Sequence, residues 1–382
     1  MGRQIYLDNS ATAWPKAPGV GRAMADYVDR VGVNVGRSSY GTANQAAWMV
    51  LETREKAAAF LGCAQPSHVV FTPGVTHSLN LVLKGLLRPG DHLVISAMEH
   101  NAVWRPAAQL AKAGVAVDVA PCDAAGWLDP DVLRALLRPN TRLVVLNHAS
   151  NVCGTIQDAG TIGAVCRERG VFFALDTAQT AGHLPLHMEE MGVSALCFTG
   201  HKGLLGPQGI GGVAVSRPLA QALEPLVAGG TGSLSSSPEM PRQMPDRLEA
   251  GTLNLPGIAG LSTALDYLTE TGAEALRRRE IALTKRLLDG ILDHPHLYVP
   301  GPADAARRVG VVSVAFKRRD NGEAAYRLEQ TYGILVRSGL HCAPLAHRSL
   351  DTFPQGTVRF SIGHGTTVQE IDAAIEAVSA LA

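Results

Sequence analysis

The sequence has no excess of charge of either sign. Lysine and arginine together number 34, aspartate and glutamate also number 34, and the formal net charge is therefore zero. Proteins that bind nucleic acid or an anionic membrane surface usually carry a cluster or an excess of positive charge. We therefore expect neither nucleic acid nor a membrane among the partners of this protein.

Long apolar runs are also missing. No stretch approaches the roughly 20 apolar residues that a membrane-spanning helix needs. The first residues lack the charged and apolar regions of a secretory signal. These absences predict a cytoplasmic protein. Of the 382 residues, 46% are hydrophobic and 18% are charged, which is typical of a globular chain long enough for two domains.

The cysteines form no recognisable framework. There are six, and none belongs to a C-x-x-C pair, which argues against a zinc ribbon and against a set of disulfides. Cys342 has His341 beside it and His347 nearby, but no further ligand lies at a spacing typical of zinc sites. We therefore expect no metal ion.

What the sequence does contain is a set of short apolar runs between Val171 and Ser216. The first ends at Asp176, and the second, residues 195–198, leads into Lys202. Such runs are typical of buried strands, and ligands of open α/β sheets bind at the carboxyl ends of strands. Asp176 and Lys202 therefore form either a buried ion pair or a site for pyridoxal phosphate (PLP). PLP needs a Schiff-base lysine and a carboxylate at its pyridine nitrogen.

The residues around this pair resemble the cysteine desulfurases, which belong to the class V aminotransferase group of fold-type I PLP enzymes. The matching segments here are Asp176–His183, Thr199–Gly203 and Gly206–Gly211, and further matches extend over Tyr6–Ser361. The resemblance implies an enzyme that converts L-cysteine to L-alanine and transfers the sulfur to one of its own cysteines as a persulfide.

The order of elements predicts an α/β fold. Strand and helix patterns alternate over residues 67–216, which favours a mainly parallel sheet with helices on both faces. The resemblance implies a seven-stranded sheet in a large PLP-binding domain of residues 16–257. It also implies a smaller α+β domain, made of residues 1–15 and 258–382, which carries the catalytic cysteine loop.

Helical patterns mark the C-terminal part. Residues 258–292 form one continuous helical pattern, and its charged run, residues 277–280, is expected to be a solvated helix face. Thr367 and Glu370 predict a capping box at the start of a last helix.

The resemblance implies roles for the residues around the cofactor ring. Lys202 carries PLP as a Schiff base, and Asp176 keeps the pyridine nitrogen protonated. Gln179 donates to the phenolate oxygen, and His100 stacks on the ring and carries protons. Asn151 faces both the cofactor and the substrate carboxylate.

The turn at residues 72–78 joins a strand to a helix and contains Gly74. Such a turn can present free N–H groups and a favourable dipole to a phosphate, or it can be an ordinary helix start with threonine as its cap. The resemblance implies the phosphate site. Its residues would be Val75, Thr76, Thr199 and His201.

A second chemical centre is the loop of residues 336–344 around Cys342. A cysteine in a polar loop beside a histidine can be exposed and easily ionised, although it can also be an incidental surface thiol. The resemblance implies that Cys342 is the nucleophile. It lies 17 positions before Arg359 (359 − 342), as in the family members with a short cysteine loop.

The substrate carboxylate needs a cation. Arg359 is expected to bind it through two parallel donors; the other interpretation is a strand-end arginine in a structural ion pair. The resemblance adds Asn9 and Arg337 on the substrate side.

Residues 248–254 match the family segment that crosses to a neighbouring subunit, where its threonine contacts the partner's PLP phosphate. The resemblance therefore implies a homodimer in which Thr252 completes the other subunit's site.

Three other functions remain open from the sequence. A selenocysteine lyase acting on L-selenocysteine would use almost the same residues. A class V transaminase or epimerase would not need Cys342. A PLP-binding sulfur-carrier scaffold would convert substrate only in the presence of a partner protein. For a desulfurase, too, a sulfur-acceptor protein is a possible partner.

Overall fold

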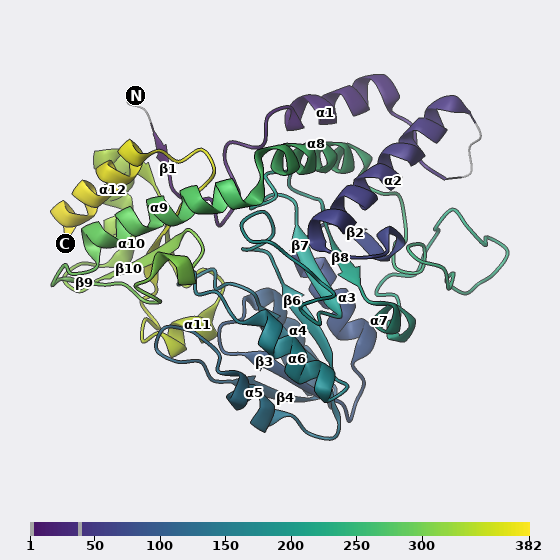
Figure 1. The fold of residues 1–382 in the computed structure, drawn as a ribbon, viewed down its shortest axis with the longest axis horizontal. Helices are drawn as coiled ribbons and strands as arrows, with labels where there is room; N and C mark the ends of the chain where they lie inside the picture. Colours follow the sequence, from purple (N-terminus) through teal and green to yellow (C-terminus); the bar gives the residue numbers. More distant parts are fainter. Residues whose placement is uncertain (1–3, 37–39) are drawn as a thin grey trace.

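A computed structural model describes residues 4–36 and 40–382 of the protein. Its centre is a seven-stranded sheet in the order β2-β8-β7-β6-β5-β3-β4 (Figure 1). β8 is antiparallel to its neighbours β2 and β7, and the other pairs are parallel. The predicted α/β fold with a mainly parallel sheet is confirmed.

Most strands of this sheet are short apolar runs that are buried on both faces, as expected for strands between two layers of helices. They are β2 (Val69–Thr72), β3 (His92–Ser96), β4 (Ala116–Ala120), β5 (Thr141–Asn147), β6 (Phe172–Asp176), β7 (Ala195–Thr199) and β8 (Gly211–Val215). Successive side chains point to opposite faces. On β6, Phe173 and Leu175 pack into one apolar cluster and Ala174 into another.

Helices cover both faces of the sheet. The first cluster contains residues of α1 (Val20–Asp26), α2 (Gly41–Leu61), α5 (Pro130–Leu136), α6 (Ala159–Glu168) and α8 (Leu255–Thr271). The second contains residues of α3 (Val75–Leu86), α4 (Asn101–Lys112) and α7 (Arg217–Ala222). Short helical turns lie at Tyr27–Val31, Pro66–His68 and Ala305–Arg307.

The C-terminal part builds a second sheet, in the order β12-β13-β10-β9, whose neighbours are antiparallel. Its strands are β9 (Leu297–Tyr298), β10 (Val311–Phe316), β12 (Arg337–Gly339) and β13 (Thr357–Ser361). A third apolar cluster joins it to α9 (Ala273–Ile291), α10 (Asn321–Tyr332) and α12 (Val368–Leu381). The short helix α11 (Pro344–Ser349) follows the cysteine loop.

The N-terminal strand belongs to this second part. β1 (Ile5–Tyr6) pairs in parallel with β11 (Ile334–Leu335), and Leu7 is buried in the third cluster. The capping box of Thr367 and Glu370 is present at the start of α12 and confirms that prediction.

The helical pattern of residues 258–292 is divided in the structure. α8 ends at Thr271, and Gly272, with φ of +82°, separates it from α9. α8 packs in the first cluster and α9 in the third. The domain boundary near residue 258 stays a prediction, and this packing leads us to propose Gly272 as the point where the second part begins.

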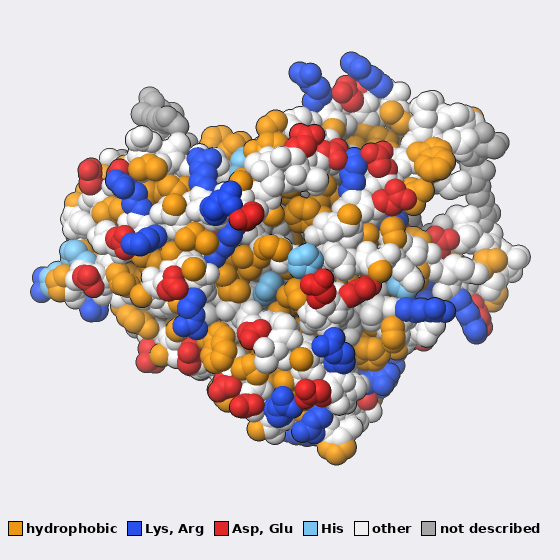
Figure 2. All heavy atoms as spheres, viewed as in Figure 1, with side chains coloured by type: hydrophobic (Ala, Val, Ile, Leu, Met, Phe, Trp, Pro, Cys, Tyr) orange, Lys and Arg blue, Asp and Glu red, His pale blue; other side chains and the backbone are white. Residues whose placement is uncertain are grey.

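Side chains of both charges are interspersed on the molecular face drawn in Figure 2. Within residues 4–36 and 40–382, no helix has the combination of length and apolar character that crossing a membrane requires.

Candidate active site

The carboxyl ends of β5, β6 and β7 meet at one edge of the large sheet. The pairing of β5 with β6 places Asn147 opposite Asp176, and the loop after β7 carries Lys202. A cavity of about 230 Å³ opens here. The predicted site residues that line it are Val75, Thr76, His100, Asn151, Asp176, Gln179, His201, Lys202, Arg337 and Arg359.

Some predicted residues lie outside this lining. Thr199 lines an adjoining hollow on the Thr76 side. Asn9 lines a smaller cavity, and its amide is occupied by the Ser361 carbonyl at 2.9 Å. Cys342 is exposed beside the cavity, and Thr252 is exposed on the surface.

Burial sets the protonation of the central pair. It lowers the pKa of Lys202 to about 8, although the nearby Asp176 carboxylate acts in the opposite direction. Burial also raises the pKa of Asp176, while the Ala178 N–H, 2.9 Å from its Oδ1, and the Lys202 amine favour the ionised form. A cation beside Asp176 would stabilise its carboxylate further.

His100 is the N-cap of α4. Its Nδ1 accepts a hydrogen bond from the Ala102 N–H at 3.0 Å, so in the neutral ring the proton is on Nε2. Burial, followed by the charge of Lys202, lowers the pKa of His100 to about 4. At neutral pH the ring is therefore uncharged and offers an N–H donor.

The N-terminus of α3 forms one end of the cavity. Its N-cap, Gly74, makes no side-chain cap, and the first N–H groups of a helix have no intrahelical partner. Val75 and Thr76 supply these groups, and His201 lies beside them. Uncapped N–H groups and the helix dipole together favour an anion.

Arg359, on β13, is almost completely buried at 1% exposure. Its Nη2 forms an ion pair with Asp8 Oδ1 at 2.8 Å, and its Nη1 donates to the Asn151 carbonyl at 3.1 Å. Its Nε has no partner among the described residues. The two outer nitrogens are thus engaged by the protein, so a carboxylate has to share them or use Nε.

The loop that carries Cys342 has an unusual backbone. His341 and Cys342 both have positive φ, +47° and +58°, a region that costs energy for residues other than glycine. Hydrogen bonds hold them there: Asn151 Nδ2 donates to the His341 carbonyl and the Asn101 N–H to the Cys342 carbonyl, each at 2.7 Å. Arg337 Nη2 lies 3.5 Å from Cys342 Sγ.

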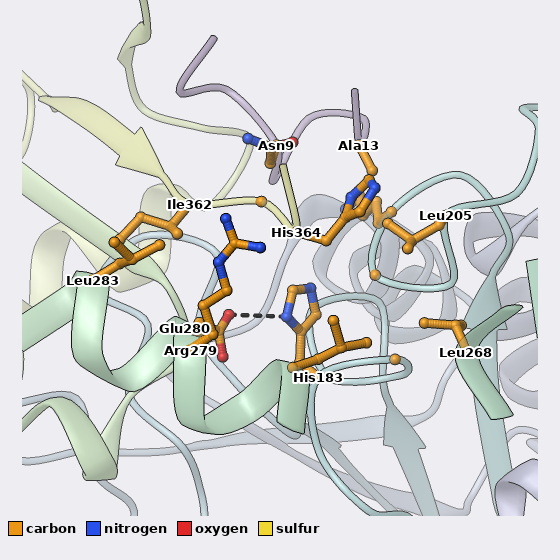
Figure 3. A pocket seen from close by; sticks show the side chains of 15 residues that line it. Asn9, Ala13, His183, Leu205, Leu268, Arg279, Glu280, Leu283, Ile362 and His364 are labelled. Atoms are coloured by element: carbon orange, nitrogen blue, oxygen red, sulfur yellow. Dashed lines mark ion pairs between the residues drawn. The ribbon is translucent and has the colours of Figure 1, made fainter. Parts of the chain in front are cut away.

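Lys202 also lines a second, smaller cavity of about 40 Å³, which Figure 3 shows. There His183, after β6, and Glu280, on α9, face each other with Nδ1 and Oε1 2.8 Å apart. The ring also packs on the backbone after Lys202, where a Cβ at Gly203 would lie 2.4 Å from it. Glu280 is buried, so the prediction that residues 277–280 form a solvated face is wrong at this residue.

Sequence reasoning missed several residues that border the site. Asn147 and His341 line the main cavity, and Glu99 is fully buried behind it, where its Oε1 accepts from the Asn147 N–H at 2.8 Å. Burial raises the pKa of Glu99 to about 8. The position of Asn147 at a strand end and of His341 beside Cys342 were the available signals.

The residues around the cavity fit PLP. They offer a buried amine, a buried carboxylate at a strand end, and an uncapped helix terminus, all on one cavity. These are the groups that suit an aldehyde, a protonated pyridine nitrogen and a phosphate, respectively.

Known proteins of similar sequence agree. The family model "Aminotransferase class-V" matches residues 5–374. A probable cysteine desulfurase of Methanothermobacter thermautotrophicus is 34% identical over 96% of this chain and 92% of that protein. The cysteine desulfurase of Pectobacterium atrosepticum is also 34% identical, over 96% of this chain and 90% of that protein.

Solved structures agree as well. The apo cysteine desulfurase of Thermococcus onnurineus superposes with a TM-score of 0.92 at 31% identity, covering 99% of this chain and 94% of that chain. The match thus includes both sheets and the cysteine loop. The chain belongs to the class V aminotransferase family and, within it, to the cysteine desulfurases.

Proposed function

We propose that this protein converts L-cysteine to L-alanine and keeps the sulfur as a persulfide on Cys342. The supporting observation is the placement of Cys342 beside a cavity that brings Lys202, Asp176 and Arg359 together. The reaction balances: the Cβ–S bond of cysteine breaks, a bond forms between that sulfur and Cys342 Sγ, and the carbon gains a proton.

The cofactor of this family is PLP, so the cofactor prediction is confirmed. When bound, PLP accepts the electrons that bond breaking leaves on the substrate. Lys202 would hold it, and its amine, when free, would be placed to move the Cα proton. Because burial lowers its pKa to about 8, part of Lys202 is neutral at working pH.

Two arginines position the substrate and the nucleophile. Arg359 offers a buried, unpartnered Nε to the substrate carboxylate. Arg337 lies on the neighbouring strand and directs a guanidinium nitrogen toward Cys342 Sγ. The sulfur of Cys342 is therefore held near the mouth while its side chain stays exposed to an acceptor.

The test is the release of alanine by Cys342→Ala. We expect this variant to bind PLP and L-cysteine but to lose roughly 4 kcal/mol of barrier lowering, about a thousandfold in rate, because no other thiol is placed to take the sulfur. Cys63→Ala, which removes a thiol elsewhere, is the matched control. A rate for Cys342→Ala within about tenfold of wild type would identify the protein as a lyase or transaminase instead.

Assembly and acceptor are part of the proposal. Thr252 is exposed and lines none of the cavities around Lys202 of its own chain, which agrees with a role in the site of a second copy. Exposure of Cys342 agrees with transfer of its persulfide sulfur to a separate acceptor protein.

A further inference from the structure

His341 has a fixed tautomer. Its Nε2 lies 3.1 Å from both the carbonyl oxygen and the Oγ1 of Thr357. A carbonyl oxygen can only accept a hydrogen bond, so Nε2 carries the proton and Nδ1 is a bare acceptor. The ring lies 5.6 Å from that of His347, and Asn151 holds the His341 carbonyl, so the ring has little freedom to turn.

The Nδ1 atom of His341 is buried and has no hydrogen-bond partner among the described residues. The residue is only 3% exposed, yet it lines the same cavity as Lys202 and Arg359. An unpaired buried acceptor is unfavourable, and one that belongs to a residue lining a cavity indicates a ligand that supplies the missing donor.

This acceptor stays neutral. Burial, followed by the charge of Arg359, lowers the pKa of His341 to about 2. The ring therefore accepts hydrogen bonds across the working pH range but does not take up a proton. This property suits a positioning role and excludes a role as general base.

L-Cysteine has three polar groups, and the cavity provides for two of them in an evident way. The amine would take its place beside Lys202, and the carboxylate would meet the Nε of Arg359. The remaining group is the S–H, a weak donor, for which an acceptor is needed next to Cys342. Arg337 has only donors, and the Nδ1 of His100 is already occupied by Ala102.

Two other buried side-chain acceptors in residues of the wall have no partner among the described residues, the Oδ1 atoms of Asn147 and Asn151. Asn147 lies opposite Asp176 in the sheet, at the pyridine end. Asn151 contacts Arg359 through its carbonyl, at the carboxylate end. His341 is the acceptor that directly precedes the nucleophile in the chain.

We propose that His341 is a specificity-determining residue, whose Nδ1 accepts a hydrogen bond from the β-thiol or β-selenol of the substrate and holds that atom in front of Cys342. The proposal rests on the proposed function. It predicts a preference for amino acids with a donor on the β-carbon, and it leaves the proton on the sulfur.

The first test compares two ligands and changes nothing at residue 341. The Cys342→Ala holoprotein, which cannot remove sulfur, is titrated with L-cysteine and with L-2-aminobutyrate, in which a methyl group replaces the S–H. Calorimetry should show L-cysteine binding about five- to tenfold more tightly. Equal affinities would overturn the proposal, and this outcome is available even if variants at residue 341 do not fold.

The second test uses two matched variants in the same background. His341→Gln can keep a donor toward Thr357 but has no acceptor at the Nδ1 position. His341→Asn places its Oδ1 near that position, and asparagine tolerates positive φ. We expect the Gln variant to bind both ligands equally and the Asn variant to retain most of the preference. If the affinities for both ligands fell by the same factor in both variants, His341 would have only a structural role.

These results separate the inference from the proposed function. If Cys342→Ala released alanine as fast as wild type, the proposed function would fail whatever His341 does. If Cys342→Ala lost alanine release but His341→Gln still preferred L-cysteine, the proposed function would stand and the role of His341 would fall.

Discussion

Burial and a neighbouring carboxylate act on the Lys202 amine in opposite directions. Burial is the larger effect and lowers its pKa to about 8, while Asp176 raises it. Lys202 is therefore partly neutral near pH 8, where an exposed lysine would be almost fully protonated. Only the neutral amine attacks an aldehyde.

The rate at which the cofactor-free protein binds PLP should accordingly rise with pH through about 8. In Asp176→Asn the rising limb should move to lower pH, because the carboxylate that favours the charged amine is gone. Stopped-flow absorbance measures both rates. A rising limb near the ordinary lysine value of 10.5 would contradict the burial of Lys202.

Arg359 has a structural and a binding role that can be separated. Arg359→Gln should raise the KM for L-cysteine at least about tenfold. It should also destabilise the fold by up to about 3 kcal/mol, because Asp8 loses its partner. Asp8→Asn breaks the same ion pair but keeps Arg359, so its KM should stay within about threefold of wild type.

Alanine release and thermal unfolding of the two variants give these values. If Asp8→Asn raised KM as much as Arg359→Gln does, Arg359 would act on the substrate only through the fold.

Two elements, helix α4 and the cysteine loop, are joined by a single backbone hydrogen bond. The N–H of Asn101, the first residue of α4, donates to the Cys342 carbonyl at 2.7 Å. Proline is well tolerated at the first position of a helix. The preceding residue, His100, has φ and ψ of −70° and 157°, which a following proline permits.

Asn101→Pro should therefore leave α4 intact and release the Cys342 loop. We expect a thermal midpoint close to that of wild type and alanine release reduced about tenfold, because the nucleophile is no longer fixed. Asn101→Ala keeps the N–H and should behave like wild type. Full activity of the proline variant would show that this hydrogen bond does not position Cys342.

Most strands of the large sheet can be predicted from sequence because they are short apolar runs, several of which end in a polar residue, as at Asp176. β4 carries Asp118 in its middle and was not predicted. The residues at which helices begin and end are harder to predict from sequence. The pattern of residues 258–292 continues through Gly272, and only the positive φ of that residue separates α8 from α9. Glycine in a helical pattern is compatible with either outcome.

Long-range partners could not be predicted at all. Glu280 lies in a charged run that fits a solvated helix face, and its burial depends on His183, which belongs to the other part of the molecule. The pairing of Asp8 with Arg359 likewise joins residues at opposite ends of the sequence. Local patterns carry no information on such contacts.

Both parts of the molecule contribute to one site. The large sheet supplies Asp176 and Lys202, and the C-terminal sheet supplies Arg337 and Arg359. Thr252 is exposed on the surface and does not line the cavity that these four residues share in its own chain. Of the predicted residues, it is the one whose proposed role requires a second copy.

The assembled protein should be a dimer with two-fold symmetry. Thr252→Ala should weaken PLP retention during dialysis, because a hydroxyl is lost at the partner's phosphate, without changing the sedimentation coefficient. Ser235→Ala, which removes the hydroxyl of another exposed residue, is a control. A fully active monomer in sedimentation velocity would contradict this arrangement.

The pairing of β1 with β11, together with the ion pair of Asp8 and Arg359, has a consequence for biosynthesis. The ribosome makes Asp8 before the strands of the large sheet and Arg359 after them, 351 positions further along the chain. All strands of the large sheet have been synthesised once the chain reaches Val215, the last residue of β8. The substrate pocket gains its buried arginine only after the whole large sheet has been synthesised, so a nascent chain that contains that sheet without β13 has no complete active site.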